Sequence, residues 1–362
     1  MRAVVYDAYA APAELRDVPE PACPDGGVLV RVAATGVCRS DWHAWQGHDP
    51  VPLPMVPGHE LAGTVAAVGA GVERWRVGQR VTVPFACGCG RCAQCAMGDT
   101  HVCPHQQQPG FTGWGSFADL VALPAADTNL VALPDAVDDV AAASLGCRTA
   151  TAHRAVVAQG RVAAGERLVV LGCGGVGLAA VAVGAALGAE VVAVDVSAAA
   201  LAAATDLGAA AVVDAAGLPA EAVAEAVRDL AGGGVHASVD ALGSVPTMTA
   251  GILALRPRGR HVQVGLLLGD DAAPPVPMAR VIAQELEVRG GHGMPARDYP
   301  DLLAMVADGR LDPARLVGRV VGLDGAAAAL ADLGRPATTP GMTVVDLLGG
   351  GGGGGGGGGF TA

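Results

Sequence analysis

Residues 167–195 read RLVVLGCGGVGLAAVAVGAALGAEVVAVD, and the order of residue types in this stretch decides the fold. A short apolar run, 168–171, comes directly before the glycine-rich segment 172–177. An alanine-rich stretch follows, and a second apolar run, 191–194, ends in Asp195. This order predicts a buried strand, a glycine turn, a helix and a second strand, which is the start of a dinucleotide-binding sheet.

The glycine turn and Asp195 together predict a cofactor site. Glycines permit the tight turn, let the backbone approach a pyrophosphate, and let the helix pack closely on the strand. A carboxylate at the end of the second strand can accept hydrogen bonds from the adenosine ribose, which predicts a preference for NAD over NADP. The alternative is that Asp195 only caps the helix that begins near Ala198. The predicted cofactor-binding residues are Gly172, Gly174, Gly175, Val176, Gly177 and Asp195.

The sequence on either side of this stretch predicts an α/β protein. From about residue 167 to 264, apolar runs alternate with helical stretches, which indicates βαβ units in a doubly wound parallel sheet. The first 150 or so residues read as short strands separated by Pro and Gly clusters. After residue 289 the chain reads as a return to that first part, and eleven glycines at 349–359 predict a flexible tail. The predicted strands are 3–6, 28–33, 61–68, 80–83, 168–171, 191–194, 211–213, 235–239, 261–264 and 285–289, with short strands near Val320 and Val344; the predicted helices are 175–187, 198–207, 219–230, 245–255 and 299–307.

The composition bounds the classes of function. The chain has 362 residues, 51% hydrophobic and 16% charged, so it is long enough for two domains and too apolar for disorder. The net charge is −12 and there is no lysine, which disfavours nucleic acid as a partner. The uncharged stretch 168–189 contains six glycines, so a buried strand, turn and helix explain it better than a membrane span. Asp7 interrupts the first apolar run, so no secretory signal is expected and a cytoplasmic location is predicted.

Five of the nine cysteines fall within residues 87–103. The spacing Cys89-x2-Cys92-x2-Cys95-x7-Cys103 lets tight turns aim four thiolates at one point, which predicts a closed, structural zinc site. The alternatives are a cluster of free thiols, a redox Cys-x-x-Cys pair, or a ligand set that begins with Cys87.

A second candidate metal site is dispersed along the chain. Cys38, His59 and Cys147 would supply two sulfurs and one nitrogen, and Glu60 could serve as an extra or alternating ligand. Three protein ligands and an exchangeable position describe a catalytic zinc. Spacing alone supports this site weakly, because a lone cysteine is usually a small buried apolar residue.

These three sets of residues, in this order, resemble the zinc-dependent medium-chain alcohol dehydrogenase family. The segment 58–63, Gly-His-Glu-Leu-Ala-Gly, looks like the zinc signature of that family, and the resemblance covers residues 1 to about 348. It implies a GroES-like β-rich catalytic domain over 1–150, with a structural zinc lobe at 87–103. A Rossmann NAD-binding domain over 151–288 follows, then a return to the catalytic domain over 289–348 and a disordered tail over 349–362.

The resemblance also implies roles for individual residues. Cys38, His59 and Cys147 would bind the catalytic zinc beside Glu60, while Cys89, Cys92, Cys95 and Cys103 would bind the structural one. Ser40 and His43 would relay a proton from the zinc-bound alcohol to solvent, and Asp41 would orient a ligand histidine. Arg39 would bind the pyrophosphate. Trp45 and Phe85 would line the substrate pocket, with ordinary core packing as the alternative for both.

The implied activity is the interconversion of an alcohol and an aldehyde or ketone with NAD, through a zinc-bound alkoxide and hydride transfer. The resemblance implies two zinc ions per chain and a homodimer or homotetramer. Where many members of the family carry a C-terminal arginine that touches the cofactor phosphates, this chain reads Gly-Met-Thr-Val at 341–344. No basic residue follows Asp195 closely either. The alternatives are a polyol or threonine-type dehydrogenase of the same superfamily, against which Cys147 argues mildly, and a zinc-stabilised NAD-binding protein without turnover.

Overall fold

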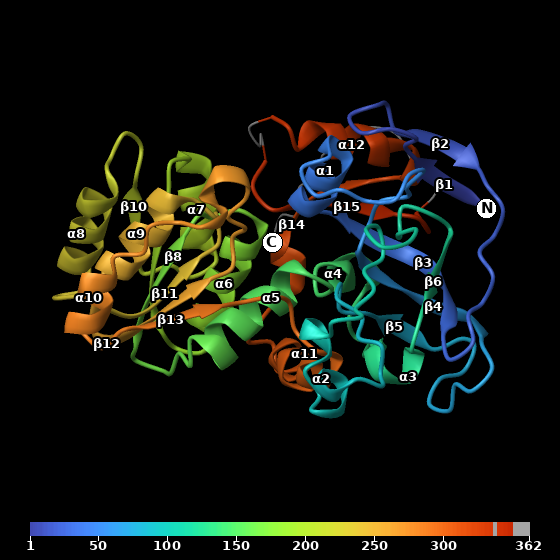
Figure 1. Ribbon diagram of the computed structural model, residues 1–362, viewed down its shortest axis with the longest axis horizontal. Helices are drawn as coiled ribbons and strands as arrows, with labels where there is room; N and C mark the ends of the chain where they lie inside the picture. Colours follow the sequence, from blue (N-terminus) through green and yellow to red (C-terminus); the bar gives the residue numbers. More distant parts are fainter. Residues whose placement is uncertain (336–338, 350–362) are drawn as a thin grey trace, which may run out of the picture.

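The computed structural model describes residues 1–335 and 339–349 of the chain, which form two large sheets, with helices between them, and one two-stranded sheet (Figure 1). One large sheet has six strands in the order β10-β9-β8-β11-β12-β13. The other has seven strands, six of them in the order β14-β15-β3-β4-β5-β7, and the seventh, β6, also pairs with β3. Most of the predicted glycine tail, residues 350–362, lies outside the described residues. No helix in the described ranges is long and apolar enough to cross a bilayer.

The six-stranded sheet is parallel throughout and contains the predicted βαβ units. Its strands are β8 (Arg167–Leu171), β9 (Glu190–Asp195), β10 (Ala211–Asp214), β11 (Val235–Asp240), β12 (Leu255–Gln263) and β13 (Glu287–Gly290). The helices are α6 (Gly175–Ala186), α7 (Ala198–Asp206), α8 (Ala220–Leu230), α9 (Val245–Leu253) and α10 (Met278–Ala283). The strand order reverses between β8 and β11, which is where a doubly wound sheet binds its ligand.

Side chains of the central strands β8 and β9 alternate between two apolar cores. Leu168 and Val170 belong to a core with α6, whereas Val169 and Leu171 belong to another core with α8 and α9. Because successive side chains of a strand point to opposite faces, a strand with helices on both faces is apolar at every position. This explains why the sequence shows continuous rather than alternating apolar runs.

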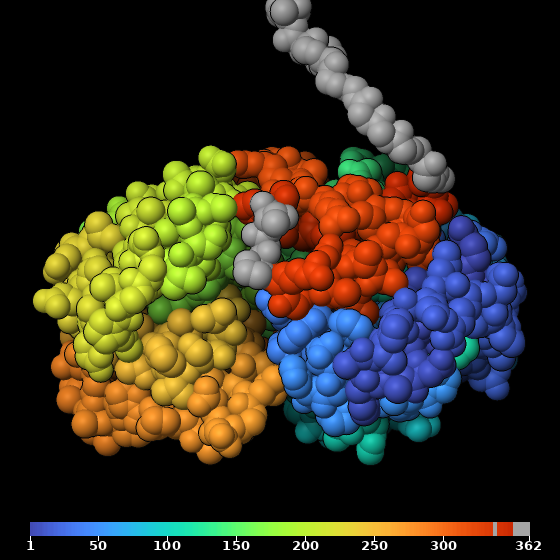
Figure 2. All heavy atoms as spheres, turned by 90° about the horizontal axis from the view of Figure 1, so that it is seen from above, coloured from blue at the N-terminus to red at the C-terminus, as the bar shows by residue number. Residues whose placement is uncertain are grey.

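The second sheet is mixed and is completed by the end of the chain. Its strands are β3 (Val28–Val37), β4 (Glu60–Val68), β5 (Arg80–Thr82), β6 (Leu120–Leu123), β7 (Val131–Ala132), β14 (Val317–Val321) and β15 (Met342–Asp346). Strand β15 pairs antiparallel with β3, which brings the C-terminal segment beside the N-terminal part of the chain (Figure 2). A separate pair, β1 (Arg2–Val5) with β2 (Glu14–Asp17), lies nearby.

The remaining helices are short and cover this second sheet or the junction between the two sheets. They are α1 (Arg39–Gln46), α2 (Ala93–Ala96), α3 (Ala126–Asn129), α4 (Asp139–Ala143), α5 (Arg148–Arg154), α11 (Tyr299–Ala307) and α12 (Ala326–Asp332). Helix α5 runs through the predicted domain boundary at residue 150, and its buried alanines join the core of the first sheet. The Tyr299 hydroxyl, at the start of α11, donates to the carbonyls of Leu145 and Gly146 at 3.1 and 3.2 Å.

The predicted elements differ from the structure chiefly at their ends. Strand β12 spans Leu255–Gln263, so the predicted helix 245–255 is too long by two residues, and the predicted strand 261–264 begins six residues late and ends one residue late. Arg256, Pro257 and Arg258 hide this strand from a search for apolar runs. Strand β3 extends to Val37, four residues beyond the predicted end at residue 33. Small residues such as Ala34 and Gly36 are buried in this extension, but they give only a weak apolar pattern in the sequence.

Candidate functional site

Four cysteines form a lobe near the second sheet. The sulfur atoms of Cys89, Cys92, Cys95 and Cys103 all lie within 4.8 Å of one another, and those of Cys92 and Cys103 are 3.5 Å apart. Four sulfurs at about 2.3 Å from one tetrahedral zinc would be about 3.8 Å apart, so the set fits this ion. Cys87 is not a member of the set, since its buried thiol donates to the Pro84 carbonyl at 3.5 Å instead.

Backbone amides in this lobe point at the sulfurs. Cys92 precedes α2, and its sulfur accepts from the Cys95 amide at 3.5 Å, while the Cys103 sulfur accepts from the amides of Cys89 and His105. A backbone amide of Arg91 lowers the pKa of Cys89 to about 6, and the Cys95 amide lowers that of Cys92. Amides that favour the thiolate favour the form that binds a metal.

The second cluster gathers residues from three distant segments. Cys38 precedes α1, His59 and Glu60 stand at the start of β4, and Cys147 precedes α5; their ligand atoms lie within 4.8 Å of one another and all four residues are buried. Two sulfurs and one nitrogen at this separation fit a zinc ion that keeps a fourth position for substrate, and the Glu60 carboxylate lies beside them.

Asp41 holds two of these segments together. Its Oδ1 lies 2.9 Å from Nδ1 of His59 and accepts from the Gly58 amide at 3.0 Å, while its Oδ2 accepts from the Cys38 amide at 3.0 Å. With Nδ1 bonded to Asp41, Nε2 of His59 is the nitrogen left for a metal. Burial alone would lower the pKa of His59, but the charge and hydrogen bond of Asp41 outweigh it and raise that pKa well above its usual value.

Charge in the second cluster is concentrated on Cys38. A hydrogen bond from the Cys147 thiol holds the pKa of Cys38 well below its usual value, and Arg148 and His59 act in the same direction. Burial raises the pKa of Glu60 to about 7, although the nearby Arg148 opposes this. The cluster therefore stabilises a thiolate where a cation can bind it.

Arg148 is a buried cation that the sequence analysis did not single out. Its backbone amide donates to Glu60 Oε1 at 3.0 Å, and its Nη2 lies 3.0 Å from Glu60 Oε2. The signal was present in the sequence, because a single charged residue follows Cys147 in an otherwise small and apolar stretch. The family resemblance points to Arg39 as the cation of the cofactor site, whereas Arg148 pairs directly with Glu60 in the metal cluster.

Ser40 and His43 lie three residues apart on α1, so both face the same side of the helix. The Cys38 thiol lies 3.9 Å from Ser40 Oγ. The His43 ring is half-buried, and its Nδ1 lies 3.1 Å from Nδ1 of the exposed His48. The helix therefore connects the second cluster to the protein surface.

The glycine turn has the shape that its sequence predicts. Gly172 has a φ of 87°, and a β-carbon on Gly177 would collide with the Gly172 carbonyl. Asp195 ends β9, and its carboxylate accepts from the amides of Cys173 at 2.6 Å and Ser197 at 2.9 Å. The cap of α7 is Ser197, whose side chain accepts from the Ala200 amide, so the alternative that Asp195 caps this helix is wrong.

Comparison with known proteins agrees with this geometry. Residues 24–135 match the family described as "Alcohol dehydrogenase GroES-like domain", and residues 175–308 match "Zinc-binding dehydrogenase". An alcohol dehydrogenase of Geobacillus stearothermophilus is 33% identical over 86% of this chain and 90% of its own. The chain belongs to the zinc-dependent medium-chain alcohol dehydrogenase family.

Two further proteins are similar to this dehydrogenase along most of its length. A sorbitol dehydrogenase of Halalkalibacterium halodurans is 31% identical over 84% of this chain and 87% of its own. A solved structure titled as an NAD-dependent alcohol dehydrogenase superposes with a TM-score of 0.85 at 31% identity, over 96% of this chain and all of its own.

Two phenylalanines adjoin the second cluster of the dehydrogenase. The rings of Phe85 and Phe111 meet the His59 ring edge-on, with centroids 6.1 and 5.3 Å away. Sequence analysis missed Phe111, since nothing in its local sequence links it to His59. Trp45 packs in apolar clusters with Ala13, and its Nε1 donates to the Ala11 carbonyl at 2.7 Å, which is the core packing that was its alternative.

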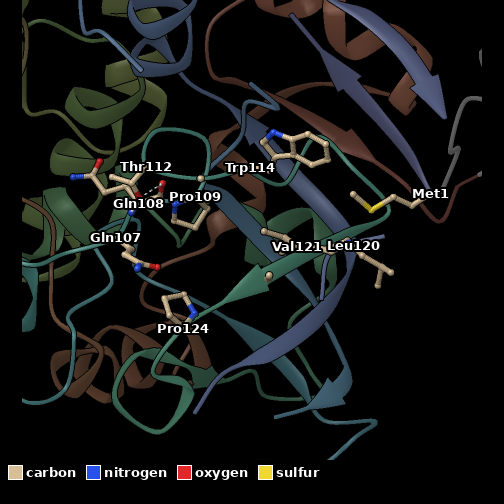
Figure 3. A pocket seen from close by; sticks show the side chains of 12 residues that line it. Met1, Gln107, Gln108, Pro109, Thr112, Trp114, Leu120, Val121 and Pro124 are labelled. Atoms are coloured by element: carbon tan, nitrogen blue, oxygen red, sulfur yellow. Dashed lines mark hydrogen bonds between the residues drawn. The ribbon is translucent and has the colours of Figure 1, made fainter. Parts of the chain in front are cut away.

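A separate hollow of about 220 Å³ lies beside β6 and is lined by Gln107, Trp114 and Leu120 among others (Figure 3). Its lining contains no acidic, histidine or cysteine side chain among the described residues, so it has none of the zinc-binding side chains that the two clusters contain.

Proposed function

We propose that this dehydrogenase oxidises a small alcohol to an aldehyde or ketone, and catalyses the reverse reaction, with NAD as the hydride acceptor. The observation that carries the proposal is the buried set of Cys38, His59, Glu60 and Cys147, whose ligand atoms lie within 4.8 Å of one another. In this proposal Cys38, His59 and Cys147 hold the catalytic zinc, and Cys89, Cys92, Cys95 and Cys103 hold the structural one.

The chemistry is divided between the bound groups and the chain. When bound, zinc supplies a Lewis acid that makes the alcohol more acidic, and NAD accepts the hydride. Ser40 accepts the hydroxyl proton, and His43 passes it to water at the surface. Asp41 keeps Nε2 of His59 aimed at the metal, and Phe85 and Phe111 exclude water beside it.

The proposed cofactor site lies at the carboxyl ends of β8 and β9. The glycine turn and the first turn of α6 present backbone amides to the diphosphate, since the first amides of a helix have no acceptor within it. Asp195 faces the ribose hydroxyls. Arg39, whose Nη1 donates to the Leu333 carbonyl at 2.6 Å, is a further proposed contact.

The test is an assay of NADH formation with primary, secondary, aromatic and polyol substrates, with NAD and NADP as cofactors, combined with metal analysis. We expect two zinc ions per chain and turnover of a simple alcohol. One zinc ion or none would contradict the ligand assignment, and NADH binding without turnover of any substrate would indicate a protein that does not catalyse.

The sorbitol dehydrogenase relative favours a polyol substrate as the second candidate. A polyol that is turned over more efficiently than every monohydric alcohol in the panel would establish it. A cytoplasmic location and a homodimer or homotetramer belong to the same proposal, and sedimentation analysis tests the oligomeric state.

A further inference from the structure

Arg148 lies between the two halves of the proposed active site. On one side its guanidinium pairs with Glu60 at 3.0 Å and its Nη2 donates to the Val37 carbonyl. On the other side it packs against the glycine turn, since a β-carbon on Gly175 would come within 3.1 Å of both Nε and Nη1. One buried side chain therefore contacts both the metal cluster and the start of α6.

Two of the donor atoms of this guanidinium have no protein oxygen as an acceptor. Nη2 is occupied by Val37 and Glu60, whereas Nε and Nη1 donate to no oxygen within residues 1–335 and 339–349. Both nitrogens lie beside Gly175, the first residue of α6, where an added β-carbon would clash with Cδ of Arg148 and lie 3.1 Å from Nε and from Nη1. Guanidinium groups and helix N-termini both bind phosphate, so this arrangement is suited to an anion.

The cavity beside Arg148 has the charge that such an anion needs. It measures about 320 Å³, and its lining includes Arg39, Arg148, Arg319 and Arg335, with Asp332 as the one acid among the described residues. Both Arg319 and Arg335 lie 3.4 Å from that aspartate. The whole chain has a net charge of −12, so the excess of positive side chains around this cavity is opposite in sign to the charge of the molecule.

Met342 lies in the stretch 341–344, where the family resemblance leads one to expect an arginine. It lines the same cavity as Arg148, and a β-carbon on Gly36 would touch both the Met342 side chain and Glu60. A cation at this place is therefore supplied from the start of α5 and not from β15.

We infer that Arg148 is a cofactor-binding residue, whose Nε and Nη1 bind the diphosphate of the dinucleotide while Glu60 anchors the rest of the guanidinium. The inference rests on the proposed function, because it requires a dinucleotide on the glycine turn. In this arrangement Arg148 contacts both the diphosphate and Glu60 of the proposed metal site.

The test compares ligand affinities of the zinc-loaded full-length protein. NADH is titrated by fluorescence, and ADP and adenosine are measured by displacement of NADH. In Arg148→Met we expect NADH and ADP to bind about 10- to 100-fold more weakly, while adenosine, which lacks phosphate, changes by less than about 3-fold. Arg154→Met is the matched control, since Arg154 lies on the same helix, pairs with Asp298 at 2.9 Å and does not line the cavity.

Each result decides between the possibilities. Equal affinity of Arg148→Met and wild type for ADP would overturn the inference, and so would an equal loss for ADP and adenosine, which indicates a structural role. If Arg148→Met does not fold because Glu60 is left unpaired, Glu60→Gln/Arg148→Met removes both charges and is compared with Glu60→Gln by the same criteria. Failure of the wild type to bind NADH would overturn the proposed function instead.

Discussion

Asp41 shows how one carboxylate can organise a site made from distant segments. It accepts from the Cys38 and Gly58 amides and bonds the ring of His59, so all its contacts serve residues at or beside proposed ligands. Its complete burial makes these bonds costly to lose, because a buried charge without partners is strongly unfavourable. A residue that is close in sequence to one proposed metal ligand, here Cys38, can therefore orient another ligand that lies farther along the chain, here His59.

At the residue scale, the first prediction concerns His43. Burial, His48 and Arg39 lower the pKa of His43 from its usual 6.5, so the neutral ring that accepts a proton persists below that pH. Replacing it in His43→Gln should slow alcohol oxidation about 10-fold or more near pH 6, and less at high pH, where hydroxide can remove the proton.

The measurement is the pH profile of kcat with and without an added amine buffer, which should partly restore the rate of His43→Gln. The exposed His48 provides the control, and His48→Gln should have a smaller effect. Loss of one zinc ion from His43→Gln would show that His43 is a ligand and not part of a relay.

A second prediction at this scale concerns Asp195 and the choice of cofactor. Its carboxylate can accept from the ribose hydroxyls of NAD, whereas the 2′-phosphate of NADP would bring a like charge against it. Asp195→Gly should shift the ratio of kcat/KM for NADP over NAD upward by about 10- to 100-fold.

The matched control is Asp214→Gly. Asp214 ends the neighbouring strand β10 and accepts from the Ala216 amide at 2.9 Å, much as Asp195 accepts from Ser197. This variant should leave the cofactor ratio near that of the wild type. A wild type that prefers NADP, or an Asp195→Gly variant that loses stability without a change in the ratio, would refute the ribose assignment.

At the scale of elements, the cysteine lobe has too little apolar packing to fold by itself. Helix α2 has four residues, none of them buried, so we expect the four sulfurs and the proposed zinc ion to hold it. Cys95→Ser should lower the free energy of unfolding by several kcal/mol and remove one zinc ion, measured by denaturant titration and metal analysis.

Two variants make this result specific. Cys38→Ser should remove activity and leave the protein folded. The residues of its cluster are buried beside α1, β4 and α5, and we expect these elements to stay packed without the metal. Cys87→Ala should keep both zinc ions, since Cys87 lies outside the set. Equal unfolding of Cys95→Ser and Cys38→Ser would contradict the division into a structural and a catalytic site.

Elements that depend on neighbouring residues could be predicted from the sequence. Features that depend on contacts between residues far apart in the chain could not. The glycine turn, α11 and the strands of the parallel sheet, apart from the first half of β12, follow from runs of adjacent residues. Strand β2 is exposed and polar, and Arg148 and Phe111 matter only through partners far along the chain. The cysteine spacing belongs to the first kind, whereas the meeting of Cys38, His59 and Cys147 needed the family resemblance and then the fold.

At the scale of the whole molecule, one apolar cluster reaches both large sheets. The same apolar cluster includes Ala62 and Leu145 from the first part of the chain, Leu168 from the six-stranded sheet, and Tyr299 and Leu302 from α11. Two parts joined by a common core unfold together, and the proposed cofactor site draws residues from both. Cofactor binding should therefore stabilise the molecule as a unit.

We accordingly predict a single thermal unfolding transition that NADH moves upward as a whole. At a concentration about 100 times its Kd, a ligand that binds only the folded state adds about 2.7 kcal/mol to the free energy of unfolding. Calorimetry of the zinc-loaded protein measures this, with NADPH at the same concentration as the control that Asp195 should reject. Two separate transitions, of which NADH moves only one, would mean that the shared core does not couple the two sheets and that the cofactor site belongs to the six-stranded sheet alone.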